Sequence, residues 1–118
     1  MDNNLIFNKS FQFAVRTVKL YKYLCAEWKE FTLSKQLLRS GTSIGANVAE
    51  AQQAQSRPDF LAKLSIALKE TSETKYWLQL MQATEYLTAQ EAASMLTDCV
   101  ELEKLLVTII KKLKDEKK

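Results

Sequence analysis

Apolar residues recur every three or four positions along almost the whole chain, and this spacing constrains the fold more than any other feature of the sequence. A repeat of that period places apolar side chains on one face of an α-helix. The turn-forming residues that strands and hairpins need are nearly absent, since the 118 residues include two glycines and one proline. The pattern predicts long helices joined by short connections.

Breaks in the repeat divide the chain into four helices. Residues 56–59 are the clearest break, because Ser56 or Arg57 can cap a helix and Pro58 is tolerated in a first turn. Thr88 is followed three residues later by Glu91, which is the spacing of a capping box. Ser10 is a good N-cap for the first helix. We predict helices over residues 11–30, 34–55, 58–87 and 89–114.

The last of these helices has the most regular apolar pattern. Its apolar residues alternate steps of four and three, which is the heptad spacing of helix–helix contacts: Met95, Cys99, Leu102, Leu106, Ile109 and Leu113. In the second helix, small residues spaced by four allow a neighbouring helix to come close: Gly41, Gly45 and Ala49. Short connections make consecutive helices antiparallel neighbours. The sequence therefore predicts one all-α domain, an antiparallel up-down four-helix bundle.

Two helices carry more apolar surface than one core needs. In the first, the predicted core stripe is Phe11, Val15, Val18 and Cys25, and a second stripe contains Phe13, Leu20 and Leu24. In the third, a second stripe contains Ile66, Trp77, Leu80 and Met81. An apolar patch that stays exposed normally marks an interface. We expect a homo-oligomer with Phe13, Leu20, Leu24 and Trp77 at its interface; the alternative is a bundle that buries a wider arc of each helix.

Residues that carry catalysis or bind metals are scarce. The chain contains no histidine, which excludes Ser–His and Cys–His nucleophile pairs and zinc sites built on histidine. Cys25 and Cys99 are too few for a four-cysteine site, and we expect both to be buried thiols without a disulfide. Both glycines lie inside a helix, so no phosphate-binding loop is present. We expect no enzymatic activity, no metal and no cofactor.

Membrane insertion and targeting also have no support in the sequence. No apolar run approaches the roughly 18 residues that a membrane span requires, and the first residues lack a basic stretch followed by an apolar one. We expect a cytoplasmic protein that makes no contact with a membrane.

The net charge of +3 is unevenly distributed. Residues 1–39 hold seven basic and three acidic side chains, residues 40–103 four and nine, and residues 104–118 six and two. Because the first and last helices of an up-down bundle are antiparallel neighbours, we expect two basic clusters to share one surface: Arg16, Lys19 and Lys22 with Lys111, Lys112 and Lys114. Such a stripe would attract the phosphates of RNA or DNA. Ordinary solubilising charge is the alternative.

A helix-turn-helix over residues 35–54, turning at 40–43, would be a different route to nucleic-acid binding. Its second helix would have to enter the major groove. Residues 43–56 contain no lysine or arginine and do contain Glu50, so the sequence does not favour this interpretation.

One polar stripe of the second helix carries a family resemblance. Gln36-Leu37-Leu38-Arg39, followed by Ser43-Ile44-x-x-Asn47-Val48-Ala49-Glu50, resembles the signature of the small four-helix-bundle proteins encoded in bacterial 23S ribosomal RNA intervening sequences. The similarity continues through Phe60-Leu61, Ile66-Ala67, Glu73 and Tyr86-Leu87, and covers about residues 11–113. The chain departs from the family pattern at four positions: Thr32, Lys35, Ala51 and Glu85, the last of which stands where the family has glycine.

The resemblance implies a homopentameric ring. It also implies a relationship to the accessory proteins of diversity-generating retroelements, which bind a reverse transcriptase and nucleic acid. The residues that match the motif are then candidates for a polar network between helices or subunits: Gln36, Arg39, Ser43, Asn47, Glu50 and Glu73. In that network Arg39 would pair with Glu50 or Glu73. The alternative function is a protein-interaction adaptor, for example one that docks a reverse transcriptase and binds no nucleic acid itself.

Overall fold

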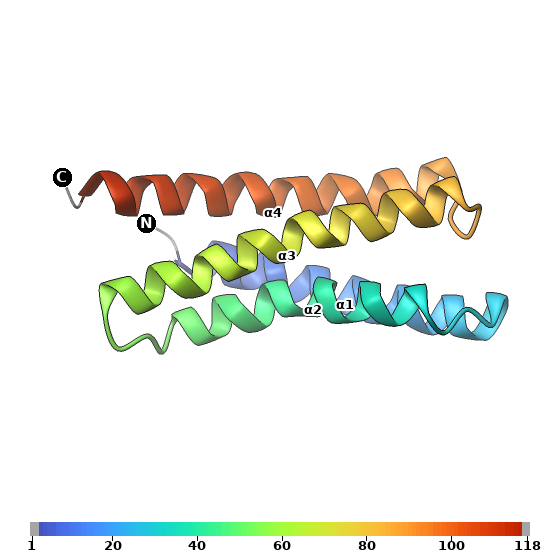
Figure 1. The fold of residues 1–118 in the computed structure, drawn as a ribbon, viewed down its shortest axis with the longest axis horizontal. Helices are drawn as coiled ribbons and strands as arrows, with labels where there is room; N and C mark the ends of the chain where they lie inside the picture. The colour runs from blue at the N-terminus through green and yellow to red at the C-terminus, as the bar shows by residue number, and fades with distance from the viewer. Residues whose placement is uncertain (1–2, 117–118) are drawn as a thin grey trace.

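The computed structural model describes residues 3–116 and contains four long helices that run alternately in opposite directions (Figure 1). They are α1 (Asn3–Trp28), α2 (Leu33–Ala51), α3 (Arg57–Ala83) and α4 (Ala89–Glu116). The bundle measures 49 × 22 × 19 Å, and both ends of the chain lie at the end that carries the α2–α3 connection. The predicted all-α, up-down four-helix bundle is confirmed. No helix within the described residues is long and apolar enough to cross a membrane.

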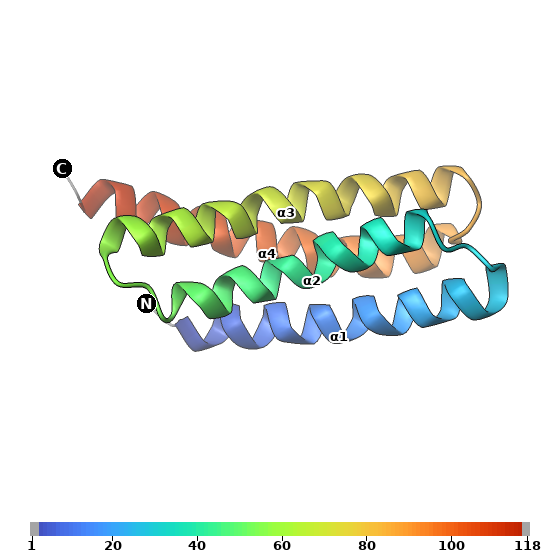
Figure 2. The ribbon, with the colours of Figure 1, turned by 60° about the horizontal axis from the view of Figure 1, so that its bottom comes forward.

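The four helices do not pack equally closely. Helix α2 packs against α1 and α3, and α3 packs against α4, whereas α1 and α4 make far fewer contacts with each other. Figure 2 shows α1 beside α2, with α4 behind α2 and α3. The bundle is therefore tightly packed on three sides and looser on the α1–α4 side.

The core seam of α4 is the one that its heptad spacing predicts. Met95, Cys99, Leu102, Leu106, Ile109 and Leu113 are all buried. The seam is easy to recognise because every one of its positions is apolar and none is interrupted by a polar residue.

Helix α1 differs from its prediction in both its start and its inward face. It begins at Asn3, so Ser10 is not an N-cap; Ser10 is fully buried, and its hydroxyl donates to the carbonyl of Phe7 at 3.0 Å. Phe13 is 2% exposed and Leu24 is fully buried, whereas Phe11 is 55% exposed. The predicted core stripe and outer stripe of α1 are therefore interchanged, and the assignment of Phe13 and Leu24 to an oligomer interface is wrong.

The cause of this difference is a pair of small polar residues in the core face of α1. Ser10 and Thr17 occupy core positions because α2 presents glycines to them. A Cβ atom added to Gly41 would lie 2.7 Å from Cγ2 of Thr17, and one added to Gly45 would lie 3.2 Å from the carbonyl oxygen of Ser10. The close approach predicted for Gly41 and Gly45 is confirmed, and it selects small side chains on α1 where the apolar pattern alone expects large ones.

Two of the predicted helix starts are confirmed in detail. Ser56 is the N-cap of α3, and its hydroxyl accepts from the backbone N–H of Asp59 at 3.1 Å. Thr88 and Glu91 form a reciprocal capping box: the backbone N–H of Thr88 donates to the Glu91 carboxylate at 2.8 Å, and the N–H of Glu91 donates to the Thr88 hydroxyl at 3.1 Å. Helix α2 is continuous through residues 40–43, so the helix-turn-helix alternative is wrong.

Helix α3 ends at Ala83, four residues before its predicted end. Glu85 adopts a left-handed backbone conformation, with φ of 70°, and the N–H groups of Tyr86 and Leu87 turn back to the carbonyl of Met81 at 2.9 and 3.2 Å. This arrangement resembles the helix-ending motif in which glycine is the usual left-handed residue. The departure of the chain from its family pattern at Glu85 thus falls on a position where the backbone favours glycine.

Glu30 caps the start of α2 from outside the helix. Its carboxylate accepts hydrogen bonds from the backbone N–H groups of Thr32, Leu33 and Ser34 at 3.2, 3.1 and 2.7 Å. Partial burial alone would raise the pKa of the Glu30 carboxyl, but the hydrogen bonds from Ser34, Leu33 and Thr32 outweigh it and lower the pKa below its usual range. The ionised carboxylate therefore stabilises the folded state.

Replacing Glu30 by alanine is expected to lower the free energy of unfolding by about 1 kcal/mol at pH 7, because three N–H groups lose their acceptor. A carboxyl with a lowered folded-state pKa contributes its stability above the unfolded-state pKa, which is about 4.3, and loses it as the pH falls through the folded-state value. The difference between the wild type and Glu30→Ala should therefore shrink below about pH 4. Denaturant unfolding at several pH values measures it. Glu27→Ala, at an exposed position one turn earlier, is the control and should leave the free energy of unfolding at pH 7 almost unchanged.

Candidate nucleic-acid and subunit interfaces

The two basic clusters that we expected to share one surface are separated along the bundle. The Arg16 guanidinium lies against the middle of α4, where it pairs with Asp98 at 2.5 Å and donates to the Ser94 hydroxyl at 2.8 Å. Lys111 follows Asp98 by 13 residues, which corresponds to about 20 Å of helix. The prediction of one continuous basic stripe is therefore wrong.

Arg16 is also less available to phosphates than its charge suggests. Asp98 neutralises it, and Lys9 is paired in the same way with Glu101 at 3.2 Å. Both ion pairs join α1 to α4 across the loosely packed side of the bundle. The sequence did not indicate Asp98 and Glu101 as partners of Arg16 and Lys9, because these charges meet only through the relative register of α1 and α4.

The lysines of the other cluster remain exposed at the end of α4. Lys111, Lys112 and Lys114 are all exposed, and none of them forms an ion pair within residues 3–116. The nearby acidic residue Glu116 is instead paired with Arg57 at the start of α3. This end of the bundle, where the chain also begins and ends in Figure 1, therefore presents unneutralised positive charge. Lys19 and Lys22 on α1 are likewise exposed.

The family-motif residues of α2 lie along one side of that helix. The Ser43 hydroxyl donates to the carbonyl of Arg39 at 2.6 Å, and the Asn47 amide donates to the carbonyl of Ser43 at 2.9 Å. Glu50 forms an ion pair with Lys63 of α3 at 3.1 Å. The predicted pairs of Arg39 with Glu50 or Glu73 are not among the ion pairs of the described residues, and Gln36 lies half-buried beside them.

The part of α3 next to Arg39 contributes two carboxylates and two aromatic rings. The indole N–H of Trp77 donates to Glu73 at 3.1 Å, and the rings of Tyr76 and Trp77 meet edge to face with centroids 5.0 Å apart. Burial and the neighbouring Glu73 carboxylate raise the pKa of Glu70, while Arg39 and Lys69 act in the opposite direction. Arg39 thus interacts electrostatically with Glu70, which the sequence analysis did not single out.

The apolar residues predicted at a subunit interface fall into two groups. Phe13 and Leu24 belong to the core, as described above, and Met81 of the predicted outer stripe of α3 is also fully buried. Leu20 and Trp77 are half-buried and pack against the core. The exposed large apolar side chains on the helices include residues that the prediction did not assign to an interface: Phe11, Tyr76 and Val107.

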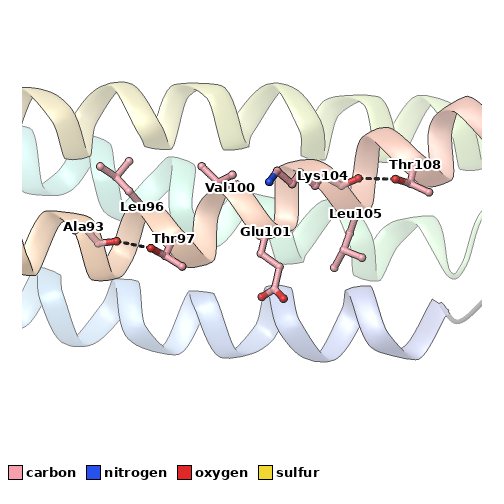
Figure 3. A pocket seen from close by; sticks show the side chains of 8 residues that line it. All are labelled: Ala93, Leu96, Thr97, Val100, Glu101, Lys104, Leu105 and Thr108. Carbon is pink, nitrogen blue, oxygen red and sulfur yellow. Dashed lines mark hydrogen bonds between the residues drawn. The ribbon is translucent and has the colours of Figure 1, made fainter.

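A concave surface with a volume of about 750 Å³ runs along the outer face of α4. Figure 3 shows that its lining side chains all come from α4, with Leu96 and Val100 on one side of the helix and Glu101 and Leu105 on the other. The Thr97 and Thr108 hydroxyls donate to their own helix, to the carbonyls of Ala93 and Lys104. This surface is a shallow groove without a group of converging polar side chains.

The two thiols do not form a reactive site. Both cysteines are free, Cys99 is buried and Cys25 is half-buried, so the predicted absence of a disulfide holds and only Cys99 is fully enclosed. Burial, with the Glu103 carboxylate, raises the pKa of the Cys99 thiol to about 12, against a smaller opposite effect of Lys75. Within residues 3–116, no cluster of three cysteine and acidic side chains could hold a metal ion.

Comparison with known proteins places this bundle in a family. The sequence profile of the 23S rRNA-intervening sequence proteins matches residues 2–108. The chain belongs to this family. A crystal structure of a protein of unknown function from the S23 ribosomal protein family of Bacteroides thetaiotaomicron is similar to it, with 58% sequence identity and a TM-score of 0.92 over 94% of this chain and 99% of the other. None of the curated proteins matches the chain.

Family membership confirms the resemblance that the α2 motif carries. This intervening-sequence protein keeps the motif residues Arg39, Ser43, Asn47 and Glu50 together on the side of α2 next to α3, where Arg39 interacts with Glu70 and Glu50 pairs with Lys63. The motif therefore marks a surface of the bundle and not an enclosed pocket.

Proposed function

We propose that this intervening-sequence protein is a non-catalytic scaffold that assembles into a homo-oligomeric ring and binds nucleic acid through exposed lysines of α4. The observation that carries the proposal is an apolar stripe on the surface of α1. Phe7, Phe11, Val15 and Val18 follow one another at helical spacing, Phe11 is 55% exposed and the rings of Phe7 and Phe11 stack with centroids 6.3 Å apart. A stripe of this kind is more typical of a subunit contact than of a solvated surface. Five copies is the number that the family resemblance implies.

The lysine cluster at the end of α4 supports the nucleic-acid part of the proposal. Lys111, Lys112 and Lys114 are exposed and form no ion pair within the described chain, so they are available to phosphates. A ring related by one rotation axis repeats the cluster in every subunit on the same face. Repetition of a modest site raises the overall affinity without any new contact.

The absence of catalysis is part of the same proposal. The chain has no histidine, and the buried Cys99 thiol, with its pKa of about 12, stays protonated at neutral pH. The concave surface on α4 is lined by two ionisable side chains, Glu101 and Lys104, and Glu101 is already paired with Lys9 of α1. We therefore expect the protein to act by binding alone.

The proposal is tested by measuring absolute mass and nucleic-acid binding. Light scattering on a sizing column at low and moderate salt should give the mass of five chains. Labelled RNA and DNA should bind with an affinity that falls steeply with salt, because each neutralised phosphate releases counterions. The double variant Lys111→Glu/Lys112→Glu should bind at least about tenfold more weakly and show a smaller salt dependence. Lys29→Glu/Lys35→Glu makes the same charge change around the α1–α2 connection, at the other end of the bundle, and is the control.

Two outcomes would contradict the proposal. A monomeric wild type would show that the apolar stripe of α1 does not mediate self-assembly. A ring of five chains that binds neither RNA nor DNA would favour the adaptor function, in which a reverse transcriptase or another protein is the partner.

A further inference from the structure

We propose that the α1 stripe of one subunit packs against the α2–α3 face of the next copy, so that α2 lies between the two contact surfaces of every subunit. The α2–α3 face is defined by Arg39 of α2 and by Ile66, Glu70, Glu73 and Trp77 of α3. Ile66 precedes Glu73 by seven residues, close to two helical turns, so both lie on the same side of α3. This inference rests on the self-assembly proposed above and adds which two surfaces meet.

The contacts inside the bundle show where the α1 stripe points. Ser10 and Thr17 face α2, where Gly45 and Gly41 lie against them. Each is preceded by a residue that reaches α4: Lys9 pairs with Glu101, and Arg16 pairs with Asp98. Phe11 follows Ser10 by one residue, and Val18 follows Thr17 by one residue. Each is therefore turned about 100° around α1, in the direction opposite to Lys9 and Arg16. The α1 stripe therefore lies on the α2 side of α1, away from α4.

The same reasoning places Glu73 and Trp77 of α3. The Thr74 hydroxyl bonds to Ser40 of α2 at 2.9 Å, and Lys75, the next residue, pairs with Glu103 of α4 at 3.1 Å. Glu73 precedes Thr74, so it points toward α2 and away from α4. Trp77 is held by Glu73 and lies on that side too. The two surfaces are thus adjacent sides of the bundle that share α2.

Adjacent sides are the geometry that a small closed ring requires. In a ring built from one repeated head-to-tail contact, the outward directions of the two mating surfaces differ by about 110° for five subunits and about 90° for four. Adjacent sides of a four-helix bundle are about 90° apart. Two opposite sides would instead give an open filament.

Shape and charge also match across this contact. The α1 stripe offers Phe11, while the α2–α3 face offers Ile66, which is 41% exposed, and the half-buried ring of Trp77. Lys22 continues the spacing of Val15 and Val18 on α1 and is exposed, with no ion pair in the described part of the chain. Glu70 and Glu73 repel each other, and burial together with that repulsion raises the pKa of Glu70. A lysine from a neighbouring subunit relieves this repulsion.

Two variants, each with one broken surface, test the pairing. Phe11→Glu disrupts the α1 stripe and Ile66→Glu disrupts the α2–α3 face; both positions are exposed, and circular dichroism checks that each variant keeps its helices. Each variant alone should have the mass of one chain. When they are mixed in equal amounts at high concentration, the intact α1 stripe of one should bind the intact α2–α3 face of the other and give a mass of two chains. Val107→Glu, on the outer face of α4 where Val107 is 46% exposed, is the control and should keep the wild-type mass.

The outcomes separate this inference from the proposed function. If Ile66→Glu keeps the wild-type mass, or if the two monomeric variants stay monomeric on mixing, these two surfaces do not meet, although self-assembly itself stands. If the wild type is a monomer, the proposed function and this inference both fail.

Discussion

Phe13→Ala is expected to lower the free energy of unfolding by about 3–5 kcal/mol, because it removes a large side chain from the core and leaves a cavity. Phe13 is 2% exposed and belongs to the buried cluster shared by all four helices. A bundle of this size has a total stability of only about 5–15 kcal/mol, so the loss would consume a large part of it.

The measurement is urea unfolding followed by circular dichroism at one fixed subunit concentration, since assembly makes apparent stability depend on concentration. Phe31→Ala removes the same side chain from a site that is 55% exposed, in the α1–α2 connection, and should change the stability by no more than about 0.5 kcal/mol. Equal effects of the two substitutions would show that Phe13 does not face the core.

Gly41→Leu is expected to destabilise the bundle by about 3 kcal/mol, since overpacking forces the backbones of two helices apart. Even a Cβ atom at Gly41 would lie 2.7 Å from Cγ2 and 2.8 Å from Oγ1 of Thr17. Thr17 cannot move away easily, because it is fully buried and its hydroxyl donates to the carbonyl of Phe13 at 2.9 Å.

Thermal and urea unfolding of Gly41→Leu measure this effect. Ala93→Leu adds the same side chain at an exposed position on the outer face of α4 and should leave the stability almost unchanged. A double variant that also carries Thr17→Ala should recover part of the loss, because it removes the atoms that the new side chain meets. No recovery would mean that the substitution acts on something other than the α1–α2 contact.

Both substitutions act on the inward face of α1 and its contact with α2, which is the part of the fold that was predicted least well from the sequence. The apolar period of α1 is clear, but two stripes of the helix satisfy it, and we predicted that the stripe containing Phe11 faces the core. The correct face contains Ser10 and Thr17, which interrupt the apolar pattern. Those residues become intelligible only beside Gly45 and Gly41, which are about 30 residues away in the chain and in direct contact in the fold.

The candidate site shows a similar division. The α2 motif was recognisable from the sequence, and its residues do lie on one side of α2. Their partners were not: Glu50 pairs with Lys63 and Arg39 interacts with Glu70, neither of which the motif names. A partner on another helix depends on the register between the two helices. The spacing of residues within one helix gives no information about that register.

Four helices, their order, the inward seam of α4 and the caps at Ser56 and at Thr88 with Glu91 could all be predicted from the amino-acid sequence. These features depend on residues within one or two turns of each other, so local spacing and capping chemistry are sufficient to predict them. Three other features could be found only in the folded bundle: which stripe of α1 faces inward, the wide separation of the two basic clusters, and the position of the motif side of α2 beside α3. Each of these depends on how one helix is rotated and shifted against another, which is decided where Gly41 and Gly45 admit Thr17 and Ser10 and where Arg16 meets Asp98.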